Sequence, residues 1–257
     1  MDDLERILAF DRDLTERTSE LVEGTAFGTA YLNLTFSERW SSNFVRVERS
    51  LDGVDADRLA ADADRVLGEH DQLRHRRVEI FDERNGPRLA SAFLEMGWSV
   101  ERNLFMVHRR PPEPRPGVAA AEMTFDEARP VIEAVMREQP YIETEEGFRQ
   151  LVGFREVLER EAGARFFVAS VDGEPAAVCE GYVLDDVGQV EDVNTVEPFR
   201  GRGLASAIVL AASAWARNHG ATLVFLVADD EDWPKELYRR LGFDDLGRSW
   251  GFTRVFA

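Results

Sequence analysis

A glycine-containing stretch, EPFRGRGLASAIVL at residues 197–210, has the residue types of a phosphate-binding turn. It lies between a segment typical of a strand and an apolar segment typical of a helix that ends at Gly220. The first N–H groups of a helix have no partner within it, and the helix dipole adds positive potential there. Gly201 and Gly203 carry no Cβ atom that would hold a phosphate away. The stretch therefore predicts an anion-binding loop, with an ordinary glycine turn as the alternative.

Two common phosphate motifs do not fit this stretch. A Walker A loop needs Lys and then Ser or Thr after its last glycine, and Leu204 and Ala205 stand there instead. The dinucleotide fingerprint G-x-G-x-x-G needs a third glycine where this chain has Ser206. The sequence therefore excludes both of these nucleotide-binding loops.

Residues 193–205, VNTVEPFRGRGLA, resemble the acetyl-coenzyme A signature of the GNAT superfamily of N-acetyltransferases, Arg/Gln-x-x-Gly-x-Gly/Ala. Arg200, Gly203 and Ala205 occupy its three defined places. Residues 237–243, LYRRLGF, resemble a second family motif, Leu-Tyr-x-x-x-Gly-Phe, at the usual distance of one strand and one short helix. The resemblance covers about residues 118–257, and more weakly 25–109. It implies an α/β (α+β) fold in which each of two tandem domains is a mixed, mostly antiparallel sheet flanked by helices.

The resemblance also implies an acyl donor, acetyl-coenzyme A, and the residues that bind it. Loop amides from Gly201 to Ser206 would hold the pyrophosphate, and the exposed backbone of Asn194 and Val196 would pair with the pantetheine arm like an added strand. Glu231 departs from the family pattern, which has Asn near the start of the last helix. The full implied set is Asn194, Thr195, Val196, Arg200, Gly201, Arg202, Gly203, Leu204, Ala205 and Ser206.

Acetyl transfer from a thioester to an amine needs a deprotonated amine, a polarised carbonyl and a proton for the departing thiolate. Tyr238 is the candidate acid because a phenol is protonated at neutral pH; the alternative is an aromatic ring packed in the core. Glu191 and Asp192 are the candidate bases, and alternation places them on opposite strand faces. Glu180 lies on the preceding strand. Either candidate base could instead be a solvated charge, and a water chain could serve as the base.

We predict no catalytic or metal-binding role for the cysteine and the histidines. Cys179, the single cysteine, is expected to be a small buried residue, because direct transfer needs no covalent intermediate. His219 abuts the helix stop at Gly220 and receives no catalytic role. The one cysteine and the four histidines have no metal-ligand spacing, so we predict no metal site.

A proline-rich segment, PPEPRPG at residues 111–117, predicts a linker between two domains. Residues 1–110 would form a degenerate GNAT-like domain, and residues 118–257 the catalytic domain that binds acetyl-coenzyme A. A shift of 145 positions, without a gap, aligns Gly97 with Gly242 and Phe93 with Tyr238. An internal repeat is therefore expected, with chance similarity as the alternative.

The first copy differs from the second where the phosphate loop would be. Asp55 and Asp57 stand where the second copy has arginines, and that position has no glycine, so this copy should repel a pyrophosphate. Its expected role is to pack and to shape the acceptor pocket. An aromatic and polar cluster that could do this, or could belong to a core strand, is Phe36, Trp40, Asn43 and Phe44.

Apolar spacing and turn residues give the expected elements that position these groups. An N-terminal helix would run from Leu4 to Val22 and end at Gly24. Other expected helices are 57–67, 87–96, 126–137, 145–159, 202–219 and 233–241. Expected strands are 43–48, 78–81, 104–107, 165–171, 176–184, 190–196, 223–226 and 250–252.

Charge and hydropathy set the outer limits of the function. The chain of 257 residues has a formal net charge of −18, which disfavours nucleic acid and anionic membranes and mildly favours cationic small molecules. It has no apolar run of about 18 residues and no basic signal start, so we expect a cytoplasmic location. The sequence predicts an N-acetyltransferase that acts on a primary amine of a small molecule. The alternatives are a protein or peptide N-acetyltransferase and a non-catalytic coenzyme A sensor or assembly module; the acceptor, the acyl chain length and the monomer or homodimer state stay open.

Overall fold

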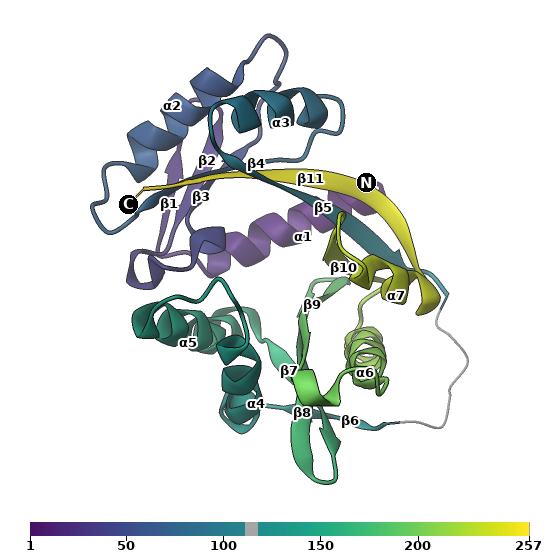
Figure 1. Ribbon diagram of the computed structural model, residues 1–257. Coiled ribbons are helices and arrows are strands. Elements are labelled where there is room, and N and C mark those ends of the chain that lie inside the picture. Colours follow the sequence, from purple (N-terminus) through teal and green to yellow (C-terminus); the bar gives the residue numbers. More distant parts are fainter. Residues whose placement is uncertain (111–117, 257) are drawn as a thin grey trace. The chain divides into compact units, whose positions relative to one another are not determined.

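The chain divides into two compact units in the computed structural model, which describes residues 1–110 and 118–256 (Figure 1). Unit 1 consists of residues 1–18, 106–228 and 232–246, and unit 2 of residues 19–105, 229–231 and 247–257. The expected linker, residues 111–117, lies outside the described residues. The two units differ from the expected domains 1–110 and 118–257, because the first helix belongs to unit 1 and the last residues belong to unit 2.

Unit 2 is a sheet covered by two helices that pack on it through one hydrophobic core. The strand order is β1-β2-β3-β4-β11-β5; β3 and β4 are parallel, whereas β1–β2, β2–β3 and β4–β11 are antiparallel. Leu59 of α2, Phe93 of α3 and Phe252 of β11 are buried in the core. The elements are β1 (Leu21–Gly24), β2 (Gly28–Leu32), β3 (Phe44–Val47), α2 (Ala56–Leu67), β4 (His75–Ile80), α3 (Gly86–Glu95), β5 (Ser99–His108) and β11 (Phe243–Val255), with short 3-10 turns at Leu34–Phe36 and Trp40–Ser42.

Unit 1 holds the glycine loop and the strands around it. Its strands follow the order β10-β9-β8-β7-β6, in which β9 and β10 are parallel and the β8–β9, β7–β8 and β6–β7 pairs are antiparallel. Helix α6 lies on one side of strands β7 to β9, and α4 and α5 lie on the other (Figure 1). The elements are α1 (Asp3–Arg17), β6 (Ala120–Met123), α4 (Phe125–Arg137), α5 (Glu145–Ala162), β7 (Arg165–Val171), β8 (Glu174–Leu184), β9 (Val187–Thr195), α6 (Leu204–Asn218), β10 (Leu223–Asp229) and α7 (Pro234–Arg240), with a 3-10 turn at Glu197–Phe199.

Two strands, β5 and β11, have residues in both units. The end of β5, residues 106–108, belongs to unit 1, whereas β11 enters unit 2 from residue 247 onward. Residues 250–255 of β11 pair with β4, from Trp250 opposite Ile80 to Val255 opposite His75. The strand beside β4 in unit 2 therefore comes from the C-terminal part of the chain.

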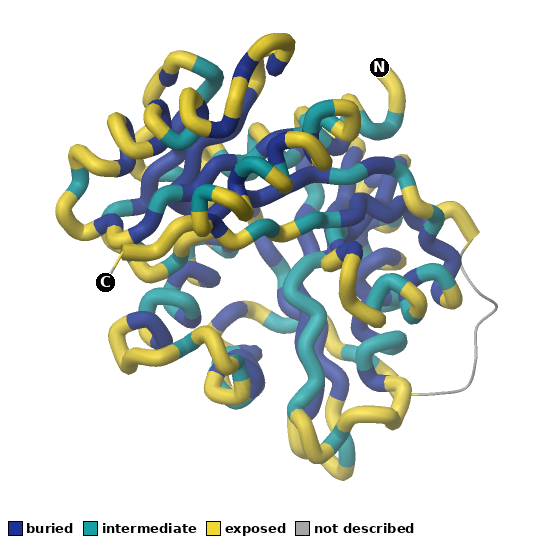
Figure 2. Tube along the Cα trace, turned by 45° about the horizontal axis from the view of Figure 1, so that its top comes forward, coloured by how far each residue is buried: buried dark blue, intermediate teal, exposed yellow. Residues whose placement is uncertain are grey.

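The burial pattern explains why most expected elements form. Strands of both units are largely buried, and the outward turns of the helices are exposed (Figure 2). The helices and strands expected from residue 43 onward are present, but β5 (Ser99–His108) and β11 (Phe243–Val255) extend well beyond the expected 104–107 and 250–252. This agreement follows from apolar residues that repeat with the period of the element and meet one core.

The expected N-terminal helix is too long. Helix α1 ends at Arg17, and residues 21–24 form strand β1, whose partners run from Leu32 to Thr29 of β2. Leu21 and Val22 are exposed, so their apolar side chains continue the helical spacing without belonging to a buried helix face. Backbone pairing with β2 satisfies the N–H and C=O groups of this segment, and that interaction is not visible in the local pattern.

Candidate functional site

The glycine loop has the backbone shape that close approach of an anion requires. Gly201 and Gly203 have φ values of 77° and 80°, in the left-handed region that favours glycine. A Cβ atom built on either residue would meet no atom within 4 Å. Gly203 precedes α6 and contributes no side chain to cap its first N–H groups. The loop therefore presents an open, uncapped helix N-terminus.

The arginines of the loop are exposed and take different partners. The Arg200 Nε donates to the Thr195 carbonyl oxygen at 3.1 Å, and its Nη2 pairs with the Glu138 carboxylate at 3.3 Å. Both carboxylate oxygens of Glu138 also accept from the Glu197 N–H at 3.1 Å. The Arg202 guanidinium lies 5.5 Å from the centre of the Phe199 ring. Glu138, at the end of α4, thus ties this helix to the loop, a contact that sequence reasoning missed.

The two halves of strand β9 (Val187–Thr195) differ in their pairing with β10 and in their burial. Its pairing with β10 runs from Val187 with Leu223 to Val190 with Leu226, and these β9 residues are buried. Residues 191–196 lie beyond that pairing and are half-buried. This part of β9 therefore offers an accessible backbone edge on the side opposite β8.

The backbone direction in this segment corrects one expectation. The Val196 N–H donates to the Ala176 carbonyl oxygen at 2.9 Å, so it is used within the sheet and is not open to a pantetheine arm. Because N–H groups alternate along a strand, Thr195 directs its amide away from β8. The Thr195 carbonyl oxygen also points away from β8, because it accepts from the Arg200 side chain of the loop.

A β-bulge lies where β9 becomes accessible. Glu180 pairs with Glu191 and Val178 pairs with Asn194, so two residues of β9 oppose the single residue Cys179. The first of these two, Asp192, has φ 51°, which is uncommon for a residue with a side chain. The bulge therefore breaks the strict face alternation that the sequence predicts for Glu191 and Asp192.

Tyr238 lies on α7 with its ring buried. The side chain is 7% exposed and packs edge-on against Phe243, with ring centroids 6.2 Å apart. Burial raises the pKa of the phenol, and the negative charge of Glu191 raises it further. The hydroxyl therefore stays protonated at neutral pH. Its equivalent in the expected repeat, Phe93, is fully buried in the core of unit 2, as expected.

The three candidate carboxylates have different partners. Glu191 accepts from the Gln189 amide at 2.6 Å and is half-buried. Asp192 pairs with the Arg155 guanidinium and accepts from the Asn194 amide at 2.7 Å. Glu180 is buried, and its Oε1 lies 2.9 Å from the Arg155 Nε. Of the two acids predicted as bases, Asp192 is thus held in an ion pair with an arginine.

Arg155, on α5, is a further residue of this site that sequence reasoning missed. It is 7% exposed, and its two carboxylate partners come from neighbouring strands. A signal was present, because Phe148, Val152, Arg155 and Leu158 fall on one helical face, and the other three are apolar. An arginine on the buried face of an amphipathic helix requires a buried partner.

Two other candidates are placed as expected. Cys179 is fully buried, and burial raises the pKa of its thiol well above the usual value, which disfavours the nucleophilic thiolate. His219 lies at the C-terminal end of α6, where its Nδ1 is 2.9 Å from the Trp215 carbonyl oxygen. Neither observation gives these residues a chemical role.

The counterpart of the loop in unit 2 is a plain helix cap. The Asp55 carboxylate accepts from the Arg58 N–H at 3.0 Å and closes the N-terminus of α2. In the predicted cluster, Asn43 is fully buried and its side chain holds the chain between β2 and β3, accepting from the Asn33 N–H at 2.7 Å. Phe44 is buried, while Trp40 is 40% exposed and stacks on His75. These residues therefore pack within unit 2, the more ordinary of the two roles expected for them.

The described part of the chain has neither a cluster of metal-ligating side chains nor a helix that could span a membrane. Within residues 1–110 and 118–256, no group of three or more His, Cys, Asp or Glu side chains could hold a metal ion. No helix in the same residues is long and apolar enough to cross a membrane.

Comparison with known proteins places the site in a family. Residues 128–243 match the model of the "Acetyltransferase (GNAT) family". The chain is 27% identical over 96 residues to the "Uncharacterized N-acetyltransferase YobR" of Bacillus subtilis, a match that covers 37% of this chain and 39% of that protein. The chain spans less than half the length of the curated relatives that it matches.

Solved structures share the fold over a larger part of the chain. A "GCN5-related N-acetyltransferase from Kribbella flavida" matches with a TM-score of 0.69 and 20% identity, covering 98% of this chain and 96% of the other. A "Tandem GNAT protein from the clavulanic acid biosynthesis pathway" matches with a TM-score of 0.54 and 14% identity over 82% of this chain and 74% of the other. The mixed, mostly antiparallel sheet flanked by helices is therefore confirmed. Residues 128–243, which carry the glycine loop and the Tyr238 motif, thus form a domain of the acetyltransferase (GNAT) family.

Proposed function

We propose that the protein is an N-acetyltransferase that moves an acetyl group from acetyl-coenzyme A directly to a primary amine of a small, cationic molecule. The observation that carries this proposal is the open glycine loop at the N-terminus of α6, next to the accessible half of β9. A phosphate group and an extended chain are the two chemical features that such a pair of surfaces fits. Coenzyme A has both.

The residues of the loop fit a pyrophosphate. The uncapped amides from Gly203 to Ser206 would donate to its oxygens, and the α6 dipole would favour its charge. Leu204 is buried, so its part would be the backbone N–H alone. Arg200 and Arg202 are exposed beside the loop and would screen the remaining negative charge.

The accessible half of β9 fits the pantetheine arm. We propose that the outward N–H group of Thr195, rather than the Val196 amide, pairs with it, since the Thr195 carbonyl oxygen already accepts from Arg200. Asn194 would contribute less through its backbone, since it pairs with Val178 within the sheet. The acyl carbonyl would then lie near the bulge, beside Glu191 and Asp192.

The proton transfers can be assigned to two residues of this chain. The amine nitrogen forms a bond to the acetyl carbon as the carbon–sulfur bond breaks, so the amine loses a proton and the thiolate gains one. We assign the proton for the sulfur to Tyr238, whose buried hydroxyl stays protonated. We assign removal of the amine proton to Glu191, directly or through water, because Asp192 is paired with Arg155.

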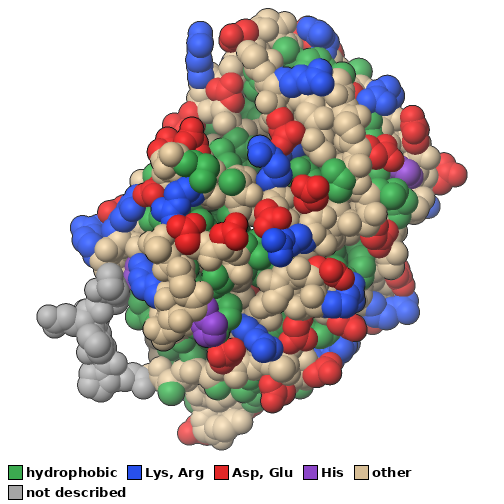
Figure 3. Space-filling model, turned by 180° about the vertical axis from the view of Figure 1, so that it is seen from behind, with side chains coloured by type: hydrophobic (Ala, Val, Ile, Leu, Met, Phe, Trp, Pro, Cys, Tyr) green, Lys and Arg blue, Asp and Glu red, His purple; other side chains and the backbone are tan. Residues whose placement is uncertain are grey.

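The cationic character of the acceptor is proposed from charge. Glu138 follows α4 directly, Glu143 lies between α4 and α5, and Glu145 and Glu146 begin α5. Gln139, next to Glu138, donates to Asn194 of β9 at 3.2 Å. Elsewhere, acidic and basic side chains are interspersed on the face that Figure 3 shows. The acidic segment thus begins beside the proposed site, where it would attract a positively charged amine.

The test uses coenzyme A binding and a matched pair of glycine variants. Gly203 and Gly220 lie at opposite ends of α6, have φ values of 80° and 98°, and each has open space around a Cβ atom. Gly203→Glu should abolish coenzyme A binding in calorimetry, because a carboxylate at the helix N-terminus repels phosphate, whereas Gly220→Glu should bind normally. Coenzyme A bound equally by both variants would contradict the loop assignment.

Turnover distinguishes the proposed enzyme from a coenzyme A sensor. Free-thiol release would be measured with a panel of polyamines, aminoglycosides, neutral amines and basic peptides. Faster release with cationic small amines supports the proposal. Release with peptides alone would favour a peptide acetyltransferase, and binding without release would favour a sensor.

A further inference from the structure

The bulge on β9 places a residue in an unfavourable conformation at the edge of the proposed site. Asp192 has φ 51°, and Val193 shares with it the single partner Cys179 on β8. A non-glycine residue in the left-handed region is held there only when surrounding interactions fix it. The direction of residues 193–195, on which the proposed pantetheine contact depends, follows from this conformation.

Arg155 makes the contacts that could fix it. Its guanidinium pairs with the Asp192 carboxylate through Nη2 and, at 2.9 Å, with Glu180 through Nε. Glu180 also accepts from the Tyr182 hydroxyl. Arg155 and Glu180 side chains are 9% and 5% exposed, so solvent screens this ion pair little. A planar guanidinium can bridge two carboxylates in a fixed geometry, which an ammonium group does less well.

The bond network continues from Asp192 into the proposed site. The Asn194 amide donates to the second carboxylate oxygen of Asp192 at 2.7 Å. The Asn194 Oδ1 accepts from the side-chain amide of Gln139. Gln139 follows Glu138, whose carboxylate contacts Arg200 of the loop. One chain of contacts thus joins α5, the bulge and the end of α4.

We propose that Arg155 is a positioning residue that holds Asp192 in its left-handed conformation and so sets the path of residues 193–195 for acetyl-coenzyme A. This inference rests on the proposed function for its link to coenzyme A. That Arg155 fixes the conformation of the bulge is inferred from the contacts of Arg155 alone. Arg155 touches neither of the proposed proton-transfer residues in these contacts, and its effect on turnover would pass through β9.

The first readout is amide hydrogen exchange in residues 190–196, which requires no ligand. Arg155→Met should speed exchange there by about tenfold or more, as expected when a coupled contact of this kind is lost. Arg155→Lys should give an intermediate rate. The control is Arg149→Met on the same helix, since the Arg149 side chain is 70% exposed and pairs with the exposed Glu146. Unchanged exchange in Arg155→Met would overturn the proposal.

A double-variant cycle separates positioning from a general loss of stability. Glycine adopts a positive φ without strain, so Asp192→Gly removes both the carboxylate and the need to hold it. In the Asp192→Gly background, Arg155→Met should change exchange in 190–196 and coenzyme A affinity much less than in the wild type. Equal effects in both backgrounds, measured where all variants are folded, would show that Arg155 acts only through stability and would overturn the proposal.

Coenzyme A affinity provides the second readout. Arg155→Met should weaken binding by about tenfold, equivalent to about 1.4 kcal/mol, with Arg149→Met unchanged. Faster exchange with unchanged affinity would refute the link between the bulge and the cofactor. Wild-type protein that binds no coenzyme A would instead contradict the proposed function, while the exchange experiment would still decide whether Arg155 holds the bulge.

Discussion

At the scale of single residues, the two adjacent candidate bases differ in the side chains that they contact. Glu191 and Asp192 are adjacent in the sequence, yet one contacts an amide and the other an arginine. The sequence supplied both as candidate bases and predicted their opposite faces, but it could not show the bulge, because Asp192 is not a glycine and nothing local marks a positive φ. It could not show the partner either, because Arg155 lies 37 positions away.

Tyr238→Phe tests the proposed acid. The variant keeps the ring that packs against Phe243, so stability should change little, while the proton for the departing sulfur is lost. We expect kcat to fall by about 10²-fold with the KM for acetyl-coenzyme A nearly unchanged. Steady-state thiol release at saturating amine measures both constants. A variant with wild-type kcat would remove Tyr238 from the mechanism.

Two buried histidines should make folding stability depend on pH. Burial, with the nearby Arg217, lowers the pKa of His108 to about 4, and burial also lowers that of His75 to about 4. In the unfolded chain both rings titrate near 6.5, so the unfolded state binds more protons between those values. The free energy of unfolding should therefore fall as the pH drops from about 6.5 to about 4, by up to about 3 kcal/mol for each ring.

Urea unfolding at several pH values between 4.5 and 7 measures this dependence. His108→Asn and His75→Asn should each flatten the curve, whatever their effect on stability at pH 7. A curve that keeps the wild-type slope in both variants would show that other groups carry the pH dependence.

At the scale of elements, periodic apolar patterns predicted which helices and strands form more accurately than they predicted where each one begins and ends. Helix α6 and strand β10 were expected because their apolar residues repeat and Gly220 separates them. The N-terminal helix was expected to continue through Leu21 and Val22, although these exposed residues form an edge strand with β2. Strand pairing depends on a partner elsewhere in the chain, and a local pattern contains no information about it.

The two glycines that follow α3 and α7 occupy equivalent positions of the expected repeat, but their surroundings differ. Gly97 and Gly242 have φ values of 78° and 93°. A Cβ atom on Gly97 would meet nothing within 4 Å, whereas on Gly242 it would lie 1.7 Å from the Arg110 carbonyl oxygen. Gly97→Ala should cost only the left-handed strain, about 1–2 kcal/mol, and Gly242→Ala should cost clearly more. Equal shifts of the urea midpoint would contradict this difference.

At the scale of the whole molecule, the sequence predicted two similar copies in order, and the structure distributes their ends between the units. Unit 1 takes α1 from the start of the chain, and unit 2 takes residues 247–257 from its end. The proline-rich segment at 111–117 marks a change between copies in the sequence, but the first helix and last strand cross that boundary. Such an exchange arises from long-range packing, so composition alone could not predict it.

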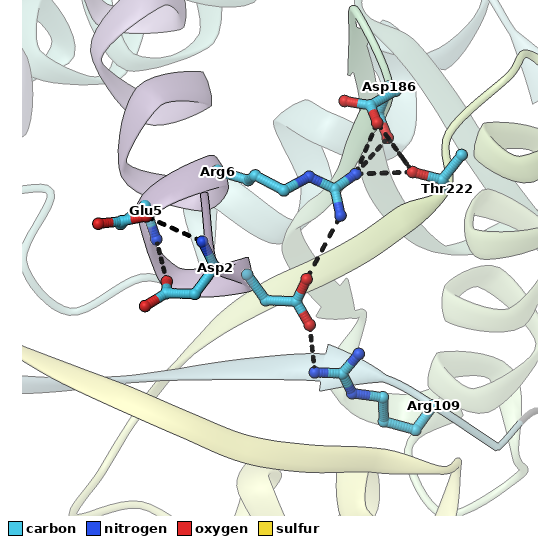
Figure 4. A network of polar contacts seen from close by, with 7 residues as sticks. Asp2, Glu5, Arg6, Arg109, Asp186 and Thr222 are labelled. Atoms are coloured by element: carbon cyan, nitrogen blue, oxygen red, sulfur yellow. Dashed lines mark hydrogen bonds and ion pairs between the residues drawn. The ribbon is translucent and has the colours of Figure 1, made fainter.

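Helix α1 is therefore expected to be essential for the fold of unit 1. Ile7 is fully buried, and Phe10 packs edge-on against Phe225 of β10 at 5.3 Å. Arg6 pairs with Asp186 at 2.7 Å and donates to Thr222 at 2.6 Å, both within unit 1 (Figure 4). Removing α1 would expose this apolar surface, whereas Arg6→Ala alone should cost no more than about 1 kcal/mol.

A fragment of residues 118–257, the predicted catalytic domain, lacks both α1 and the end of β5. We expect it to be insoluble or to lack a cooperative thermal transition, because the buried surface around Phe225 would face water. Circular dichroism with thermal unfolding measures this, and co-expression with residues 1–110 should restore a folded complex if the exchanged elements are what the fragment needs. A fragment that unfolds cooperatively at the wild-type midpoint and binds coenzyme A would show instead that the second copy is an independent domain.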